Sequence, residues 1–390
     1  MTEKLYYQDG YQRAFTSTVR SCEKKETTYL VVLEATLFYP EGGGQPADWG
    51  SLDEARVLDV QERDGKIYHE TDRPLAIGQE IRGVIDWERR FDLMQNHSGE
   101  HILSGVICSE YQCQNVGFHM GKERILIDFD TRIPKEDLAG LEERANEAIW
   151  RNMAVQVAYP PKDVLEGLAY RSKIEIEGQV RIVEVQGYDC CACCGLHVDR
   201  AGEIGIIQIT AHQSYKGGTR LEILCGKRAL TQIRKKNLAA DAVGRLLSVP
   251  GDGILSSVEG LLEEREQLGL RVNRLKGRIY QEKAEQLAQQ GQDVAYYGTA
   301  LTGKDAIHFA DGLVKRTGKR VFVFSPVEEG FAYVLVSGAK DAKELFGKLQ
   351  ERFSCKGGGK ADAVQGRIAG EKDEILAFWR EMDFYCEGEE

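Results

Sequence analysis

Two short motifs constrain the fold of this chain more than any other feature of its sequence. His97 and His101 stand four residues apart, and at that spacing on a helix both imidazoles project from one face. Cys193 and His197 have the same separation, with Gly195 between them to let the backbone fold back. Three imidazoles and one thiolate are ligands that zinc prefers, and copper and nickel accept similar sets. We therefore expect the cysteine segment to pack against the histidine helix around a metal ion.

The cysteines favour metal binding over disulfide bonds. Four of the ten fall within residues 190–194, and the first residues of the chain show no signal peptide. A structural zinc on a Cys-x-x-Cys pair is an alternative, but it needs a second such pair elsewhere, and the sequence has none. We expect Cys193 to be the ligand, with Cys194 as its main rival.

The composition predicts a cytoplasmic protein of several domains. The chain has 390 residues, of which 42% are hydrophobic and 29% charged, as in ordinary globular proteins. A net charge of −11 excludes a uniformly basic surface for nucleic acid but leaves room for a local basic patch. No apolar stretch is long enough to span a membrane, so we expect no membrane contact.

The order of elements predicts an α+β fold of four domains. Residues 1–90 contain short β-branched runs around a Gly-rich loop, which indicates a small β-barrel. Residues 91–225 begin with the histidine helix and continue as an α/β domain with the zinc site. Residues 226–292 carry apolar residues at alternating steps of four and three, which predicts an antiparallel helical hairpin or coiled coil. Residues 293–390 predict a compact α/β domain.

Two glycine-rich segments are candidates for ligand contact. Three glycines precede Gln45, and their missing side chains allow close backbone approach to a ligand, although a sharp turn of the barrel is the simpler explanation. The second segment is Lys356, Gly357, Gly358, Gly359 and Lys360. Glycines flanked by lysines suit phosphate, through backbone N–H groups and positive charge, and a plain glycine turn explains them nearly as well.

Taken together, these motifs resemble the alanyl-tRNA editing domain. Gly-Gly-Gly-Gln-Pro at 42–46 and the two metal motifs follow in the order and spacing of that domain, which occurs within alanyl-tRNA synthetases and in freestanding AlaX proteins. Residues 357–366 resemble the DHH-associated C-terminal domain that ends those synthetases. The chain has no Asp-His-His motif, and about twenty residues before the barrel leave no room for an aminoacylation domain. It is similar to a long, freestanding AlaX-type protein.

The resemblance implies hydrolysis, in trans, of tRNA(Ala) mischarged with serine or glycine, without aminoacylation activity. An alanine pocket cannot strongly reject these two amino acids by size, so a second, hydrolytic site is needed. The implied cofactor is one Zn²⁺ per chain, on the residues of the two metal motifs. Gln45, His97, His101 and Cys193 are the implied catalytic residues. The implied substrate-binding residues are Gln45, His119, Asp128, Arg181 and the segment from Lys356 to Lys360.

Partners and alternatives follow from the same resemblance. The C-terminal domain is implied to hold tRNA, and it or the helical hairpin is a candidate contact for a homodimer. One departure concerns specificity: the family usually has Thr before the last histidine, where this chain has Leu196. The sequence therefore does not determine which mischarged amino acid is the substrate. One alternative is a non-catalytic tRNA-binding protein with a structural zinc, because four protein ligands close a tetrahedral site. The other alternative is a zinc hydrolase that acts on a small ester.

Overall fold

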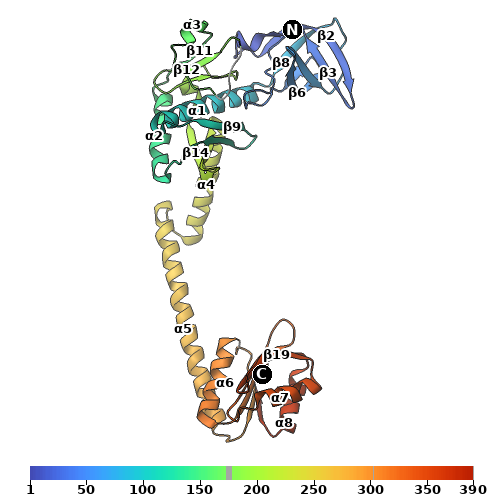
Figure 1. The fold of residues 1–390 in the computed structure, drawn as a ribbon, viewed down its shortest axis with the longest axis vertical. Helices are drawn as coiled ribbons and strands as arrows, with labels where there is room; N and C mark the ends of the chain where they lie inside the picture. The colour runs from blue at the N-terminus through green and yellow to red at the C-terminus, as the bar shows by residue number, and fades with distance from the viewer. Residues whose placement is uncertain (173–177, 302, 390) are drawn as a thin grey trace. The chain divides into compact units, whose positions relative to one another are not determined.

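The computed structural model describes residues 1–172, 178–301 and 303–389. It separates into two units, Met1–Leu246 and Leu247–Glu390 (Figure 1). Both units combine helices and strands, so the predicted α+β multidomain class is confirmed. The finer division into four domains stays a prediction. Among the helices of the described residues, none has both the length and the apolar character needed to cross a membrane.

Six strands at the start of the first unit close into a barrel, drawn in blue in Figure 1. In barrel order they are β2 (Ala14–Lys25), β3 (Thr28–Leu33), β7 (Lys66–Thr71), β6 (Ala55–Arg63), β5 (Gly50–Leu52) and β8 (Glu80–Ile85). Exposed and buried residues alternate strictly along β8, as the two-residue period of a strand requires. The buried side chains of Leu52, Val60 and Ile67 belong to the core of this unit.

Helix α1 (Trp87–Tyr111) leads out of the barrel (Figure 1). It contains both predicted histidines, His97 and His101. Its N-cap residue is Asp86, whose side chain accepts a hydrogen bond from the Arg89 backbone N at 3.1 Å. Its C-cap residue is Gln112, which has a left-handed φ of 50°. Between Leu93 and Cys108 almost every residue is buried, because sheets and helices of the same unit surround this helix.

Two sheets and a helix pack around α1. The first sheet has the order β14 (Ile207–Tyr215), β15 (Gly218–Cys225), β10 (Ile125–Phe129), β9 (Asn115–Met120), and the second has the order β11 (Val155–Ala158), β12 (Ile182–Val185), β13 (Asp189–Ala192). Helix α2 (Leu138–Trp150) packs on α1 and on β14. Glycines on α1 permit the close approach: a Cβ on Gly99 would lie 2.3 Å from Cys225 Sγ, and one on Gly105 would lie 2.2 Å from the Tyr188 carbonyl oxygen.

The helical region consists of α4 (Gly226–Leu247) and α5 (Ile254–Ala288), with a 3-10 turn (Gly251–Gly253) between them. Pro250 directly precedes this turn, so the helical pattern is interrupted there. An antiparallel arrangement of the two helices stays a prediction. The heptad residues of α5 are exposed: Val258, Leu261, Leu268, Val272, Leu275 and Ile279.

The second unit is built on a six-stranded sheet with helices on both faces. Its strand order is β19 (Cys355–Gly359), β20 (Ala363–Ile368), β18 (Phe331–Ser337), β17 (Arg320–Pro326), β16 (Val294–Tyr297), β21 (Tyr385–Gly388). Helix α6 (Lys304–Thr317) and the end of α5 share one core with the sheet. Helices α7 (Ala342–Arg352) and α8 (Lys372–Glu381) share the other.

The C-terminal glycines form a strand, which differs from the phosphate-binding turn considered from the sequence. Gly357 and Gly359 belong to β19, which pairs antiparallel with β20 at the edge of the sheet. Their missing side chains make this pairing possible: a Cβ would lie 2.2 Å from Tyr333 Oη at the first position and 2.0 Å from the Ala363 carbonyl oxygen at the second.

Candidate metal centre

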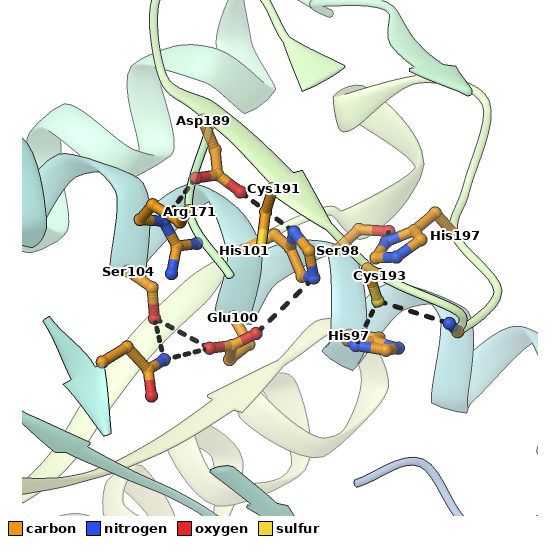
Figure 2. Close-up of polar contacts among 12 residues, drawn as sticks. His97, Ser98, Glu100, His101, Ser104, Arg171, Asp189, Cys191, Cys193 and His197 are labelled. Atoms are coloured by element: carbon orange, nitrogen blue, oxygen red, sulfur yellow. Dashed lines mark hydrogen bonds and ion pairs between the residues drawn. The ribbon is translucent and has the colours of Figure 1, made fainter. Parts of the chain in front are cut away.

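Helix α1 and the segment after β13 bring the four predicted ligands into one group (Figure 2). The ligand atoms of His97, His101, Cys193 and His197 all lie within 4.8 Å of one another, and the three histidines are buried. Two histidines come from adjacent turns of α1, as the four-residue spacing predicted. Cys194, the rival ligand, is exposed and does not belong to the group.

The spacing of these atoms suits a tetrahedral zinc ion. Cys193 Sγ lies 3.5 Å from His97 Nε2. Zinc bonds of about 2.05 Å to nitrogen and about 2.3 Å to sulfur place the two atoms about 3.6 Å apart in a tetrahedron. In addition, His197 Nε2 is buried and has no hydrogen-bond partner among the described residues. A buried nitrogen without a partner is unfavourable, and a metal ion at the centre of the group would satisfy it.

Each imidazole is held at its Nδ1 atom by a different polar side chain. The pairs are Gln45 Oε1 with His97 at 2.9 Å, Asp189 Oδ2 with His101 at 2.9 Å, and Ser98 Oγ with His197 at 3.1 Å. Amide and carboxylate oxygens only accept hydrogen bonds, so the first two histidines carry a proton on Nδ1. These contacts occupy Nδ1 and leave Nε2 of each ring to face the group, where Nε2 of His101 also lies 4.0 Å from Glu100 Oε2. Binding through one ring nitrogen while the other is hydrogen-bonded is the usual arrangement around metal-bound histidine.

The charges within the group favour a thiolate. Burial raises the pKa of Cys193, but nearby His97 and His101 outweigh it, and the pKa falls well below its usual range. The Gly195 backbone N donates to Cys193 Sγ at 3.3 Å. Burial, together with the neighbouring His97 and His101, lowers the pKa of His197 to about 3, so its ring is neutral. A thiolate and a neutral imidazole are the protonation states that bind metal.

Arg181 shapes the backbone of the ligand segment. Its Nη1 donates to the carbonyl oxygens of Cys193 and Gly195, both at 2.8 Å. Its guanidinium also lies 5.2 Å from the ring centroid of Tyr7, whose hydroxyl donates to the Cys194 carbonyl at 2.9 Å. The structure therefore places this predicted pocket residue beside the metal group, where it fixes the segment that carries the cysteine.

Two other predicted pocket residues lie outside the metal group. Asp128 on β10 accepts from Nε and Nη2 of Arg220 at 2.6 and 2.7 Å, an ion pair between neighbouring strands. His119 on β9 is exposed, whereas its neighbour Phe118 stacks on His97 with centroids 5.2 Å apart. Successive residues of a strand point to opposite faces, so His119 lies on the face of β9 opposite the one that contacts His97. Lys356 and Lys360 are exposed in the second unit.

Sequence reasoning missed the residues that contact the histidines from outside the group. Ser98 stands inside the first motif and Asp189 begins the cysteine segment, so both were adjacent to recognised residues. Phe118 carried no signal at all. No spacing rule connects any of them to its histidine, because each contact depends on how distant segments pack.

Helix α1, which leaves the small barrel, supplies two residues of this buried group, and the segment after β13 supplies Cys193 and His197. Comparison with known sequences assigns a chain with these features to the class of synthetase-type editing domains. Residues 5–89 match the family "tRNA synthetases class II (A)". Residues 180–222 match the "Threonyl and Alanyl tRNA synthetase second additional domain". The second match covers Arg181, Cys193 and His197.

Two full-length relatives extend these matches. The chain is 28% identical over 398 residues to the alanyl-tRNA editing protein AlaX-L of Pyrococcus horikoshii, covering 96% of this chain and 97% of the relative. It is 30% identical over 390 residues to the alanyl-tRNA editing protein Aarsd1 of Mus musculus, covering 93% of each. The chain belongs to the family of alanyl-tRNA editing proteins. These proteins are deacylases, so the chain is an enzyme of the hydrolase class.

A solved structure has a weaker likeness. The C-Ala domain of Aquifex aeolicus alanyl-tRNA synthetase is 22% identical and covers 23% of this chain and 85% of the solved domain, with a TM-score of 0.20. At that score the similarity supports no conclusion about the fold.

Proposed function

We propose that this protein hydrolyses tRNA(Ala) mischarged with serine, and more weakly with glycine, as a freestanding enzyme without aminoacylation activity. The observation that carries the proposal is the buried group of His97, His101, Cys193 and His197 in a chain of this family. Its ten cysteines are free thiols, in keeping with a cytoplasmic enzyme that acts on tRNA.

We propose one Zn²⁺ per chain, held by these four residues. When bound, zinc supplies a Lewis acid that can polarise an ester carbonyl or lower the pKa of a water molecule. The chain itself fixes where the ligands point: the Nδ1 partners orient the rings, and Arg181 holds the backbone on both sides of Cys194. These contacts preorganise the site before substrate binds.

Gln45 is the proposed contact to the amino acid of the substrate. Its Oε1 accepts from His97 Nδ1 at 2.9 Å and from the Leu196 backbone N at 3.0 Å, which fixes the orientation of the side-chain amide. Its Nε2 is buried and has no hydrogen-bond partner among the described residues. A fixed donor without a partner can bind the serine hydroxyl and stabilise it by hydrogen bonding. Leu196 has an aliphatic side chain that is buried in the core. It therefore cannot form the hydrogen bond to serine that a threonine hydroxyl at this position could form.

We propose that the second unit contacts the tRNA backbone through the edge of its sheet. Lys356 and Lys360 are exposed on and beside β19, and Arg367 is the cross-strand neighbour of Lys356. Positive side chains along one edge suit phosphate groups, and this local patch reconciles RNA binding with an acidic chain.

We also propose that the protein forms a homodimer through α5. Its exposed heptad residues would otherwise leave a long apolar stripe in water, and heptads of this kind pair helices. Leu268→Glu should shift the molecular mass in solution from dimer to monomer in light scattering. A dimer that persists in this variant would contradict pairing through α5.

The deciding experiment measures amino acid release from Ser-tRNA(Ala), Gly-tRNA(Ala) and Ala-tRNA(Ala). We expect serine to be released faster than alanine, with loss of activity in Cys193→Ala and retention in the matched variant Cys194→Ala. Binding of tRNA without any release would favour a non-catalytic protein with a structural zinc. Release from a small amino acid ester that is unchanged in a Lys356→Ala/Lys360→Ala variant, with no preference for tRNA, would favour a small-ester hydrolase.

A further inference from the structure

A buried carboxylate connects one histidine of the metal group to an arginine (Figure 2). Asp189 Oδ2 accepts from His101 Nδ1 at 2.9 Å, and its Oδ1 accepts from Arg171 Nε at 2.8 Å. The carboxylate is almost fully buried, with 1% of its side chain exposed. Each of its two oxygens therefore has a separate partner. The three residues are connected by hydrogen bonds that lead from Arg171 through Asp189 to His101 in the metal group.

The backbone fixes this carboxylate from two sides. Asp189 is the first residue of β13, and Gly105 lets it approach α1: a Cβ on Gly105 would lie 2.7 Å from Asp189 Cβ. Arg171 is held beside the same strand, because its N donates to the Cys190 carbonyl and its carbonyl accepts from the Ala192 N, both at 2.8 Å. A side chain fixed in this way can impose an orientation on the ring that it contacts.

We propose that Asp189 is a positioning residue that aims Nε2 of His101 at the metal, and that Arg171 holds the carboxylate in place. The proposal rests on the metal centre of the proposed function. A carboxylate accepts hydrogen bonds only, so it fixes the ring proton on Nδ1 and leaves the Nε2 lone pair for a metal ion. The opposite charge of Arg171 stabilises the buried carboxylate, which would otherwise be unfavourable.

A second metal ion is the competing explanation for the same residues. Ligand atoms of His101, Asp189 and Cys191 also lie within 4.8 Å of one another. However, the guanidinium of Arg171 already lies 2.8 Å from the carboxylate. Its positive charge compensates Asp189 and opposes a further cation at that point, so the positioning role agrees better with the charges.

Asparagine is the informative replacement for Asp189. It keeps nearly the same volume, but one oxygen becomes an amide NH₂ group, which donates instead of accepting. In either orientation this group faces a donor, on His101 or on Arg171. Asp189→Asn should therefore release the ring of His101 or leave the arginine without its partner.

The test measures zinc affinity by competition with a chromophoric chelator, on the full-length protein. We expect Asp189→Asn to bind zinc about 10- to 100-fold more weakly, the usual effect of losing such a contact. The cobalt-substituted variant should show an altered thiolate charge-transfer band. Arg171→Gln should weaken zinc binding in the same direction but less. Asp341→Asn, which removes a carboxylate from Arg320 in the second unit, is the matched control and should keep wild-type affinity.

Wild-type zinc affinity and an unchanged cobalt spectrum in folded Asp189→Asn would refute the positioning role. Two metal ions in the wild type and one in the variant would also refute it, since Asp189 would then be a ligand. If Asp189→Asn does not fold, unchanged affinity in Arg171→Gln refutes the proposal instead. A wild type that binds zinc but releases no amino acid would contradict the proposed function and leave this inference standing.

Discussion

Gly195→Ala is predicted to damage the metal centre by steric overlap alone. A Cβ at this position would lie 2.0 Å from His97 Cε1, 2.3 Å from its Nδ1 and 3.0 Å from Gln45 Oε1. Gly195 does not belong to the positive-φ residues, so its backbone conformation accepts a side chain without strain. The substitution therefore adds one methyl group between the cysteine segment and the first histidine and changes little else.

The size of the effect follows from the overlap. Carbon atoms in contact stand about 3.5 Å apart, so either His97 or the segment must move by about 1.5 Å. Metal–ligand distances tolerate about 0.2 Å, which means that one ligand is lost. The free energy of zinc binding to structural four-ligand sites is about 10–16 kcal/mol, which corresponds to about 3 kcal/mol for each ligand. At 1.4 kcal/mol per factor of ten, the affinity should fall about 100-fold.

The assay is chelator competition at fixed pH, with Gly140→Ala as the matched control. Gly140 lies on α2, and a Cβ there would have no heavy atom of the described residues within 4 Å beyond its own helix and chain neighbours. We expect this control to keep wild-type zinc affinity and to gain about 0.5–1 kcal/mol in the free energy of unfolding. Zinc affinity within threefold of wild type in Gly195→Ala would refute the reasoning, because the segment would then move without losing His97 as a ligand.

Three further predictions concern pH, metal and salt. Burial lowers the pKa of His69 to about 4. The unfolded state then binds more protons than the folded state between about pH 6.5 and 4, so stability should fall by about 3 kcal/mol as the pH drops through this window. His69→Gln should flatten that part of the urea-unfolding profile, and an unchanged slope would contradict a neutral buried histidine. Removing zinc should lower the melting temperature, and added zinc should restore it, because only the folded chain holds the ligands together; identical melting curves would argue against a resident metal. Lys356→Ala/Lys360→Ala should reduce the slope of log affinity for tRNA against log salt by about 1.4 to 1.8, one phosphate contact for each lysine. An unchanged slope would show that these two lysines do not contact the tRNA phosphates.

In the second unit, the glycine-rich motif did not predict the local structure correctly. Glycines beside lysines suggested a phosphate-binding turn, but Gly357 and Gly359 instead line an edge strand that passes close to Tyr333 and Ala363. Glycine marks close approach in both cases, and the sequence does not say whether the approaching group is a ligand or the neighbouring strand.

In the first unit, sequence motifs have a similar limit at the site. Asp128 and His119 lie in segments that resemble a pocket lining, and neither belongs to the metal group: Asp128 pairs with Arg220 and His119 is exposed. Their part in substrate binding stays a prediction. The residue that reaches His97 from this sheet is Phe118. Which side of a strand faces a site depends on register, and register is set by pairing with other strands.

The sequence by itself determined what depends on local spacing. The four-residue separation of His97 and His101 predicted their common helix face, because residues at this spacing lie one helical turn apart. The short segment from Cys193 to His197 predicted the other two residues of the group. Only the tertiary structure decided which groups hold the rings. Gln45 and Asp189 contact their histidines across 52 and 88 residues. No local rule spans such distances, because these contacts exist only once the barrel, the helix and the sheets have packed together.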